Sequence, residues 1–169
     1  MADPGAITYD HANALHKSMR WIGASVPGAW VLSRTLHHID KPIAKLTKGR
    51  HTFGSLTTGL PIMSLTTTGA KSGLPRTVPV VGMPVDRGVA IIASNFGRTR
   101  HPAWYYNLRA NPAAETYVDG TRTLVTAVEA TGDRRAAIWH EALQVYPGFQ
   151  SYDRRVAERE IVVFVLEPA

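Results

Sequence analysis

A glycine-bounded turn rich in cations is the segment best suited to binding an anionic ligand. It is the stretch Leu65–Arg76 (LTTTGAKSGLPR), with Lys71, Ser72 and Gly73 at its tip. Glycine lets backbone amides approach an anion closely, while lysine, arginine and serine add charge and hydrogen-bond donors. No Asp or Glu lies within residues 41–85, whereas six Lys or Arg do. The pattern favours a phosphorylated or polycarboxylate ligand, and a solvated basic hairpin is the alternative.

A second candidate site joins a glycine loop to an aromatic helix. Residues 93–97 (ASNFG) should end a strand, and residues 101–108 (HPAWYYNL) should form a short helix. A flat aromatic ligand could lie against the strand end, with Trp104 shielding it and Asn107 bonding its polar edge. In the alternative, Trp104 and Leu108, four residues apart, pack into the core.

Three aromatic residues follow the last long predicted helix. Tyr146, Phe149 and Tyr152 are spaced by three around a Pro-Gly pair, and the segment from this pair through Tyr152 should form a short turn. Exposed aromatics near such a loop suggest a lid over an apolar substrate, and a core role for Tyr146 is the alternative. Other chemistries lack a signature: there is no Gly-x-Ser-x-Gly elbow, no histidine spacing typical of a metal site and no cysteine.

The elements that position these residues change character along the chain. From residue 51 on, short β-branched runs between turn residues predict about six strands. They are Pro61–Thr68, Arg76–Val85, Gly88–Asn95, Ala113–Val118, Thr121–Ala130 and Glu160–Leu166. Helices are expected at His101–Ala110 and Asp133–Tyr146. Strands at this spacing, joined by hairpins, favour an antiparallel barrel, so the expected class is α+β.

The N-terminal region is helical and basic by pattern. Residues 8–46 predict two amphipathic helices, the first with Leu15, Met19 and Ile22 on its apolar face. Seven Lys or Arg face three acids in residues 1–50, and the whole 169-residue chain carries +6. We therefore expect a helical arm at 1–49 and a barrel domain at 50–169.

This arm either packs on the barrel or lies on an anionic membrane through residues 8–46. No zinc-finger, homeodomain or RNA-recognition signature points to a nucleic-acid partner. The first residues, Met1 to Pro4, lack the basic start and apolar run of a secretion signal. The expected location is cytoplasmic. The alternative is a peripheral position at the inner face of the cell membrane.

Four segments, in this order, carry a family resemblance. They are LTTTGAKSGLPR at 65–76, ASNFG at 93–97, HPAWYYNLRANP at 101–112 and YPGFQSY at 146–152. Together they resemble the deazaflavin-dependent nitroreductase family of actinobacteria, which are reductases that use F420H2. The resemblance implies a split β-barrel, reduced coenzyme F420 as hydride donor, and an electron-poor double bond as acceptor. Enones and quinones are the implied substrates, nitro compounds are side substrates, and the basic N-terminus is similar to a membrane-associated subgroup.

Carried over by motif, the resemblance also implies site residues. The cofactor-binding set is Lys71, Ser72, Gly73, Arg76, Pro79, Ala93, Ser94, Asn95, Trp104 and Asn107. The first four would hold the phosphate and acidic tail, and the others would line the deazaflavin pocket. Tyr146, Phe149 and Tyr152 would face the substrate, with Tyr146, Tyr152 and Ser94 as catalytic candidates. Phe149 stands where some members have tyrosine, which removes one hydroxyl from the substrate side. No metal ligand is implied.

The implied chemistry needs no catalytic triad. The cofactor carries the hydride, and the protein supplies position, shielding and a donor where negative charge develops. One alternative is an FMN-binding reductase, because split barrels also bind flavin. Another is a non-enzymatic protein that binds a deazaflavin or an apolar ligand, and a third is a membrane-peripheral adaptor. The pattern leaves the oligomeric state open.

Overall fold

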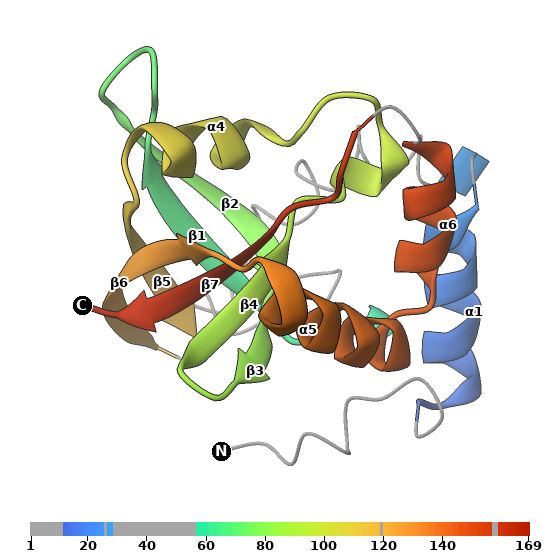
Figure 1. Ribbon diagram of the computed structural model, residues 1–169. Coiled ribbons are helices and arrows are strands. Elements are labelled where there is room, and N and C mark those ends of the chain that lie inside the picture. The colour runs from blue at the N-terminus through green and yellow to red at the C-terminus, as the bar shows by residue number, and fades with distance from the viewer. Residues whose placement is uncertain (1–11, 26, 29–56, 119, 157–158) are drawn as a thin grey trace.

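The computed structural model describes residues 12–25, 27–28, 57–118, 120–156 and 159–169. Within them one antiparallel sheet curls into a half-barrel (Figure 1). Its strands are β1 (Ile62–Thr68), β2 (Pro75–Val81), β3 (Met83–Val85), β4 (Gly88–Ile92), β5 (Ala113–Val118), β6 (Thr121–Glu129) and β7 (Val163–Pro168). They pair in the order β2-β1-β5-β6-β7-β4-β3. This confirms the predicted α+β split barrel.

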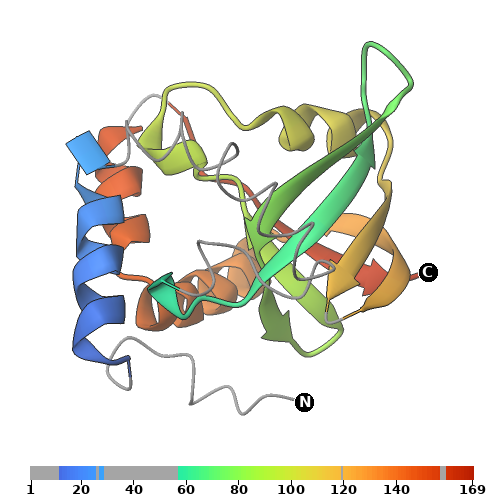
Figure 2. The ribbon, with the colours of Figure 1, turned by 180° about the vertical axis from the view of Figure 1, so that it is seen from behind.

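Helices cover two sides of the half-barrel. They are α1 (Ala14–Ala24), α4 (Ala103–Ala110), α5 (Gly132–Val145) and α6 (Gly148–Arg155), with a short 3-10 turn, η2 (Asn95–Gly97). Figures 1 and 2 show α4 across one end of the sheet, α5 and α6 on another side, and α1 outermost beside α6. None of the helices in the described ranges has the length and apolar character needed to cross a membrane.

Strand alternation creates two apolar layers. Successive residues of a strand point to opposite faces, so Phe164 faces one layer while Val163 and Val165 face the other. The first layer lies inside the half-barrel and is closed by Trp104 and Leu108 of α4. The second packs under the buried faces of α5 and α6. Each fully buried large aliphatic side chain contributes about 1.5–3 kcal/mol, and α4 is thereby fixed against the sheet.

The predicted strand at 76–85 is divided in the structure. Gly82 separates β2 from β3, and its amide donates to the carbonyl oxygen of Pro61 at 2.9 Å. A Cβ on Gly82 would lie 2.8 Å from Met63 Sδ and from Val89 Cγ1. Only glycine therefore lets the chain bend this close to its neighbours. Seven strands result in the described chain instead of about six.

The predicted apolar face of the first helix is not the face that packs on the barrel. Leu15 and Ile22 are 62% and 41% exposed, whereas Arg20 is only 2% exposed. The Arg20 guanidinium donates to the carbonyl oxygens of Thr58 at 2.7 Å and Val145 at 2.8 Å. The face of α1 that turns inward is therefore the one whose arginine bonds to these two carbonyl oxygens. Hydrophobic periodicity does not reveal such bonds.

The described part of the arm contacts α6. Arg155 of α6 donates a hydrogen bond to the carbonyl oxygen of Ala24 at the end of α1, and Ala24 packs on the same apolar layer as α6. The second predicted helix, at residues 29–46, and the predicted boundary at residues 49–50 lie outside the described residues.

Candidate cofactor site

The β1–β2 turn is closed by its own backbone. The Gly69 amide donates to the Leu74 carbonyl oxygen at 2.9 Å, and the Gly73 amide donates to the Gly69 oxygen at 2.8 Å. Gly73 has φ +66 with open space around its Cβ position, so position 73 needs glycine for its conformation. Position 69 needs glycine for room, because a Cβ there would lie 2.6 Å from Ser72 Oγ. The tip residues Lys71 and Ser72 are exposed. The turn projects past α4, on the side away from α1 and α6 (Figures 1 and 2).

The side chain of Asn107 on α4 holds this turn through two hydrogen bonds. Its Oδ1 accepts a hydrogen bond from the Ala70 amide at 2.9 Å, and its Nδ2 donates to Thr67 Oγ1 at 2.9 Å. Both side chains are buried. The amide predicted to meet the polar edge of a ligand is instead bonded to the backbone that presents Lys71. In the structure it is a positioning residue for the turn.

The cations at the turn have no carboxylate partner among the described residues. Lys71 and Arg76 are exposed and form no ion pair there. Elsewhere Arg109 pairs with Glu129 at 2.5 Å and Arg134 with Glu167 at 2.8 Å. Two unneutralised cations beside a serine hydroxyl and a glycine turn fit the phosphate and carboxylates of an anionic cofactor tail.

A second predicted segment forms a strained loop after β4. Ala93 and Ser94 are buried, and the two residues after them have left-handed backbone, Asn95 with φ 48 and Phe96 with φ 57. For residues with a Cβ this conformation costs about 1–2 kcal/mol each. The Asn95 side chain spans the loop by donating to the Arg100 carbonyl oxygen at 2.8 Å. Surrounding contacts must therefore hold the loop in shape.

The loop packs directly on α6. The rings of Phe96 and Tyr152 meet edge to face with centroids 6.4 Å apart. A Cβ on Gly97 would lie 3.2 Å from Tyr152 Cα, and Gly97 has φ +74. Glycine adopts the positive φ and leaves room for Tyr152, so the end of β4 and helix α6 come into contact here.

The aromatic trio is buried, so the expectation of exposed residues in a short turn is wrong. Tyr146, Phe149 and Tyr152 are between 3% and 7% exposed, and the last two lie on α6. Their rings pack with centroids 5.1 to 6.3 Å apart. The physical reason is Gly148, where a Cβ would lie 2.3 Å from Tyr146 Cζ. This glycine lets Tyr146 fold under α6 instead of standing out as a lid.

The two tyrosines of the trio form a buried hydroxyl pair. Tyr146 Oη and Tyr152 Oη lie 2.8 Å apart. Burial raises the pKa of both phenols, and the neighbouring Tyr152 raises the pKa of Tyr146 further. The guanidinium of Arg155 lies 5.4 Å from the Tyr152 ring centroid. The pair is therefore neutral over the physiological range and suited to donate a hydrogen bond rather than to act as a base.

Two predicted pocket residues do not share a face. Trp104 is a core residue whose ring meets Phe164 edge to face at 6.3 Å. Pro79 is exposed on β2, and strand alternation points it away from the layer that buries Val80 and Trp104. The inward packing of Trp104 and Leu108 is the alternative that the sequence left open.

The other predicted residues form two groups. The turn group is Lys71, Ser72, Gly73, Arg76 and Asn107. The loop group is Ala93, Ser94 and Asn95 beside Tyr146, Phe149 and Tyr152. Helix α4 runs between them, since it begins after the loop and bonds to the turn (Figure 1).

Sequence reasoning missed the residue that contacts the loop group most extensively. Arg159 donates to the carbonyl oxygens of Ala93 and Ser94 from a position 65 residues beyond Ser94. No local pattern marks it, because it stands in a short connection before β7 and its partners are backbone atoms. Arg20, buried under α1, was missed for the same reason.

Comparison with known proteins places the chain in a family. The family described as F420H(2)-dependent quinone reductase matches residues 40–168. The provisionally named F420H(2)-dependent quinone reductase Rv3178 of Mycobacterium tuberculosis is 32% identical over 109 residues, which are 64% of this chain and 91% of that relative. The F420H(2)-dependent quinone reductase Rv1261c of the same organism is 43% identical over 67 residues, 40% of this chain and 45% of the relative.

Solved structures agree with this assignment. A structure described as an F420-H2 dependent reductase (FDR-A) is 37% identical, with a TM-score of 0.58 over 63% of this chain and 94% of that one. Another, described as a domain-swapped dimer, is 33% identical, with a TM-score of 0.61 over 83% and 99%. The family match covers most of the chain and confirms the resemblance found in the motifs. The chain therefore belongs to the F420H(2)-dependent quinone reductase family and is an oxidoreductase that uses reduced coenzyme F420.

Proposed function

We propose that the protein reduces a quinone-like, electron-poor substrate, with the cofactor tail at the β1–β2 turn. The observation that carries the proposal is the acid-free turn that presents Lys71 and Arg76 on a backbone fixed by Asn107. The names of the relatives, which are quinone reductases, support the choice of acceptor. Enones and nitro compounds are also electron-poor acceptors, and we place them as side substrates.

The turn group would hold the anionic part of the cofactor. Lys71 and Arg76 would supply charge-assisted hydrogen bonds to phosphate and carboxylate oxygens. Ser72 already accepts from the Leu74 amide at 3.3 Å, which leaves its hydroxyl proton free to donate to a ligand. Gly73 keeps the tip free of a side chain that would obstruct the approach.

The loop group would form the redox end of the site. The reduced cofactor supplies a hydride when bound. Against it, Ala93 and Ser94 would provide a rigid buried wall, and the apolar packing of Phe149 would keep water out. The Tyr146–Tyr152 pair would donate a hydrogen bond to a substrate oxygen that gains negative charge, and that oxygen would take its proton from solvent. The raised pKa keeps both phenols protonated, and so able to donate this hydrogen bond, across the physiological range.

An FMN-binding reductase and a non-enzymatic carrier are the two alternatives for the bound cofactor and the reaction. The phosphate of FMN would also suit the turn, but the relatives and FDR-A are named for F420. A carrier protein would have no need for a neutral phenol pair beside the loop. We propose a cytoplasmic location with peripheral membrane contact through α1, because Leu15 and Trp21 are exposed there. Pelleting with anionic but not neutral vesicles, lost when Trp21 is changed to serine, tests that contact.

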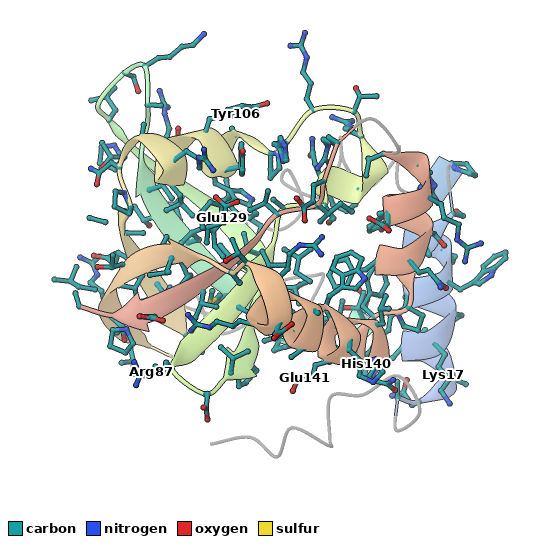
Figure 3. All side chains as sticks on the ribbon, in the orientation of Figure 1. Lys17, Arg87, Tyr106, Glu129, His140 and Glu141 are labelled. Carbon is teal, nitrogen blue, oxygen red and sulfur yellow. The ribbon has the colours of Figure 1, made fainter. Side chains whose placement is uncertain are left out.

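Cofactor titration of variants tests the tail assignment. Removing one charge-assisted hydrogen bond costs about 1.5–3 kcal/mol, so Lys71→Ala should weaken F420 binding about 10- to 150-fold. Arg87→Ala is the matched control, because Arg87 is exposed on the β3–β4 turn away from the β1–β2 turn (Figure 3). Fluorescence quenching of F420 gives both dissociation constants. Equal affinity in wild type, Lys71→Ala and Arg76→Ala would exclude the turn as the tail site.

The acceptor is tested with the same preparations. Wild type should oxidise F420H2 faster with a naphthoquinone than with an enone or a nitroimidazole. A protein that binds F420 tightly but transfers its hydride to none of the three would be a carrier, and the proposed reaction would be wrong.

A further inference from the structure

Arg159 lies just before β7 and reaches back to the loop that follows β4. A guanidinium has five N–H bonds, and each has an acceptor here. Nη2 lies 2.9 Å from the Ser94 carbonyl oxygen and 2.9 Å from that of Arg98, and Nε lies 3.1 Å from the same Arg98 oxygen. Nη1 lies 3.2 Å from the Ala93 oxygen and 3.2 Å from His101 Nδ1. A longer contact of 3.5 Å joins Nη1 to the carbonyl oxygen of the neighbouring Glu160. The shorter contacts all lead to one loop and the histidine after it.

The loop held in this way does not keep its shape by local preference. Asn95 and Phe96 both have positive φ, a region that residues with a Cβ rarely adopt. On one side the loop rests on Tyr152 of α6. Two backbone bonds lie within the loop, from the Gly97 amide to the Ser94 oxygen at 3.0 Å and from the Arg98 amide to the Asn95 oxygen at 3.1 Å. From outside the loop, Arg159 donates to the carbonyl oxygens of Ala93, Ser94 and Arg98. A strained segment that depends on outside contacts opens when one of those contacts is lost.

His101 completes this arrangement as an acceptor. Because a guanidinium can only donate, Nδ1 of His101 must present a lone pair to Arg159, which requires a neutral ring. The ring stacks on Tyr105 with centroids 3.9 Å apart and meets Tyr106 edge-on at 6.1 Å. Burial and the charge of Arg159 lower the pKa of His101, while Glu129, which lies below α4 in Figure 3, acts in the opposite direction.

The geometry points to Arg159 as the positioning residue that shapes the 93–98 loop for the cofactor, with neutral His101 as its partner. The inference rests on the proposed placement of the redox end against this loop. Arg159 acts through backbone carbonyl oxygens and not through the reacting atoms. Loss of the guanidinium leaves the oxygens of Ala93, Ser94 and Arg98 without this donor. Protonation of His101 places a positive charge beside Arg159, so acid should loosen the same loop.

Hydrogen exchange of the protein without cofactor tests the clamp itself. Arg159→Gln should speed exchange of the amides at residues 94–98 on the order of tenfold or more. Arg135→Gln is the matched control. Arg135 donates to the Ile161 carbonyl oxygen at 3.0 Å and pairs with Glu160 at 2.8 Å, so it contacts the same connection without touching the loop. The control should lower the melting temperature and leave exchange at 94–98 unchanged.

Cofactor affinity and pH give a readout that general destabilisation does not move. At temperatures where all variants are folded, Arg159→Gln should weaken F420 binding about tenfold or more, and Arg135→Gln should not. Arg159→Lys keeps the charge but has one nitrogen, so it should recover only part of the affinity. Between about pH 8 and about pH 5.5, loop exchange in wild type should rise above the intrinsic trend. His101→Gln keeps an acceptor that does not titrate, so this extra rise should disappear.

The opposite results overturn the inference. Unchanged exchange at 94–98 in Arg159→Gln shows that the guanidinium does not hold the loop. If Arg159→Gln does not fold, two other results overturn the inference together. They are unchanged exchange at 94–98 in Arg159→Lys and an extra rise of exchange in acid that persists in His101→Gln. Equal loss of F420 affinity in Arg135→Gln shows a general stability effect. If wild type fails to bind F420, the proposed function fails, while the exchange experiment still decides the clamp.

Discussion

Replacing Asn107 by leucine tests whether α4 positions the turn that we assign to the cofactor tail. Leucine has a similar volume, so the change removes two hydrogen bonds without opening a large cavity. The Ala70 amide, at the exposed turn, can bond to water instead. Thr67 is 2% exposed and cannot, so its hydroxyl loses the 2.9 Å donor and keeps only the longer contact, 3.5 Å, to the Arg76 carbonyl oxygen. A buried polar group left without its partner costs about 1–3 kcal/mol. We expect Asn107→Leu to lower the free energy of unfolding by that amount.

The same variant should lose cofactor affinity, because the Ala70 backbone is released beside Lys71. The expected loss is about tenfold, or ~1.4 kcal/mol. Urea unfolding measures the stability and fluorescence titration measures the affinity. Thr67→Val supplies the matched control, since it removes the Thr67 hydroxyl but leaves the Asn107–Ala70 bond intact. It should reduce stability with little effect on F420. If Asn107→Leu is destabilised yet binds F420 as tightly as wild type, the turn is not positioned by α4 for the cofactor.

Three further predictions concern Arg20, the Tyr152 hydroxyl and the pH dependence of stability. Arg20→Met should reduce the free energy of unfolding by about 1–3 kcal/mol, measured in urea, because the carbonyls of Thr58 and Val145 lose their donor; an unchanged midpoint would contradict the role of Arg20 in anchoring α1. Tyr152→Phe should lower kcat with quinone and leave F420 affinity within about twofold, while an unaltered kcat would remove the phenol pair from the chemistry. Because the folded-state pKa of both phenols is raised, the pair's contribution to stability is full below about pH 10 and is lost as pH rises above it; melting curves should show this alkaline loss in wild type and less of it in Tyr152→Phe.

Much of the sheet could be predicted from the sequence because its signals are local. Alternating β-branched residues and glycine turns mark β1, β2 and the turn between them. The structure keeps the bounds of β1 and the start of β2 within one residue, and it divides the predicted strand at 76–85 into β2 and β3. Pro-Gly pairs usually break structure, so the sequence predicts a short turn after Pro147. In the structure Pro147 is the N-cap of helix α6, and Gly148 allows close packing on Tyr146.

The unpredicted part of the site depends on contacts between distant residues. Arg159 meets the loop across 65 positions, and Asn107 meets Ala70 across 37. Each ends on a backbone atom, so the identity of the partner residue carries no signal. The inward face of α1 follows the same rule, since Arg20 bonds to two carbonyl oxygens. Hydrophobic periodicity records which residues avoid water, not which polar groups find a buried partner.

The proposed function depends on the reduction of a quinone by F420H2 on this chain. Anaerobic mixing of the wild-type protein with F420H2 and a naphthoquinone, followed by deazaflavin absorbance, measures this most directly, with reduced FMN as the competing cofactor. We predict that one cofactor is oxidised for each quinone reduced, at a rate that saturates with F420H2, and that FMN supports no comparable turnover. Turnover with reduced FMN but not with F420H2 would contradict the account.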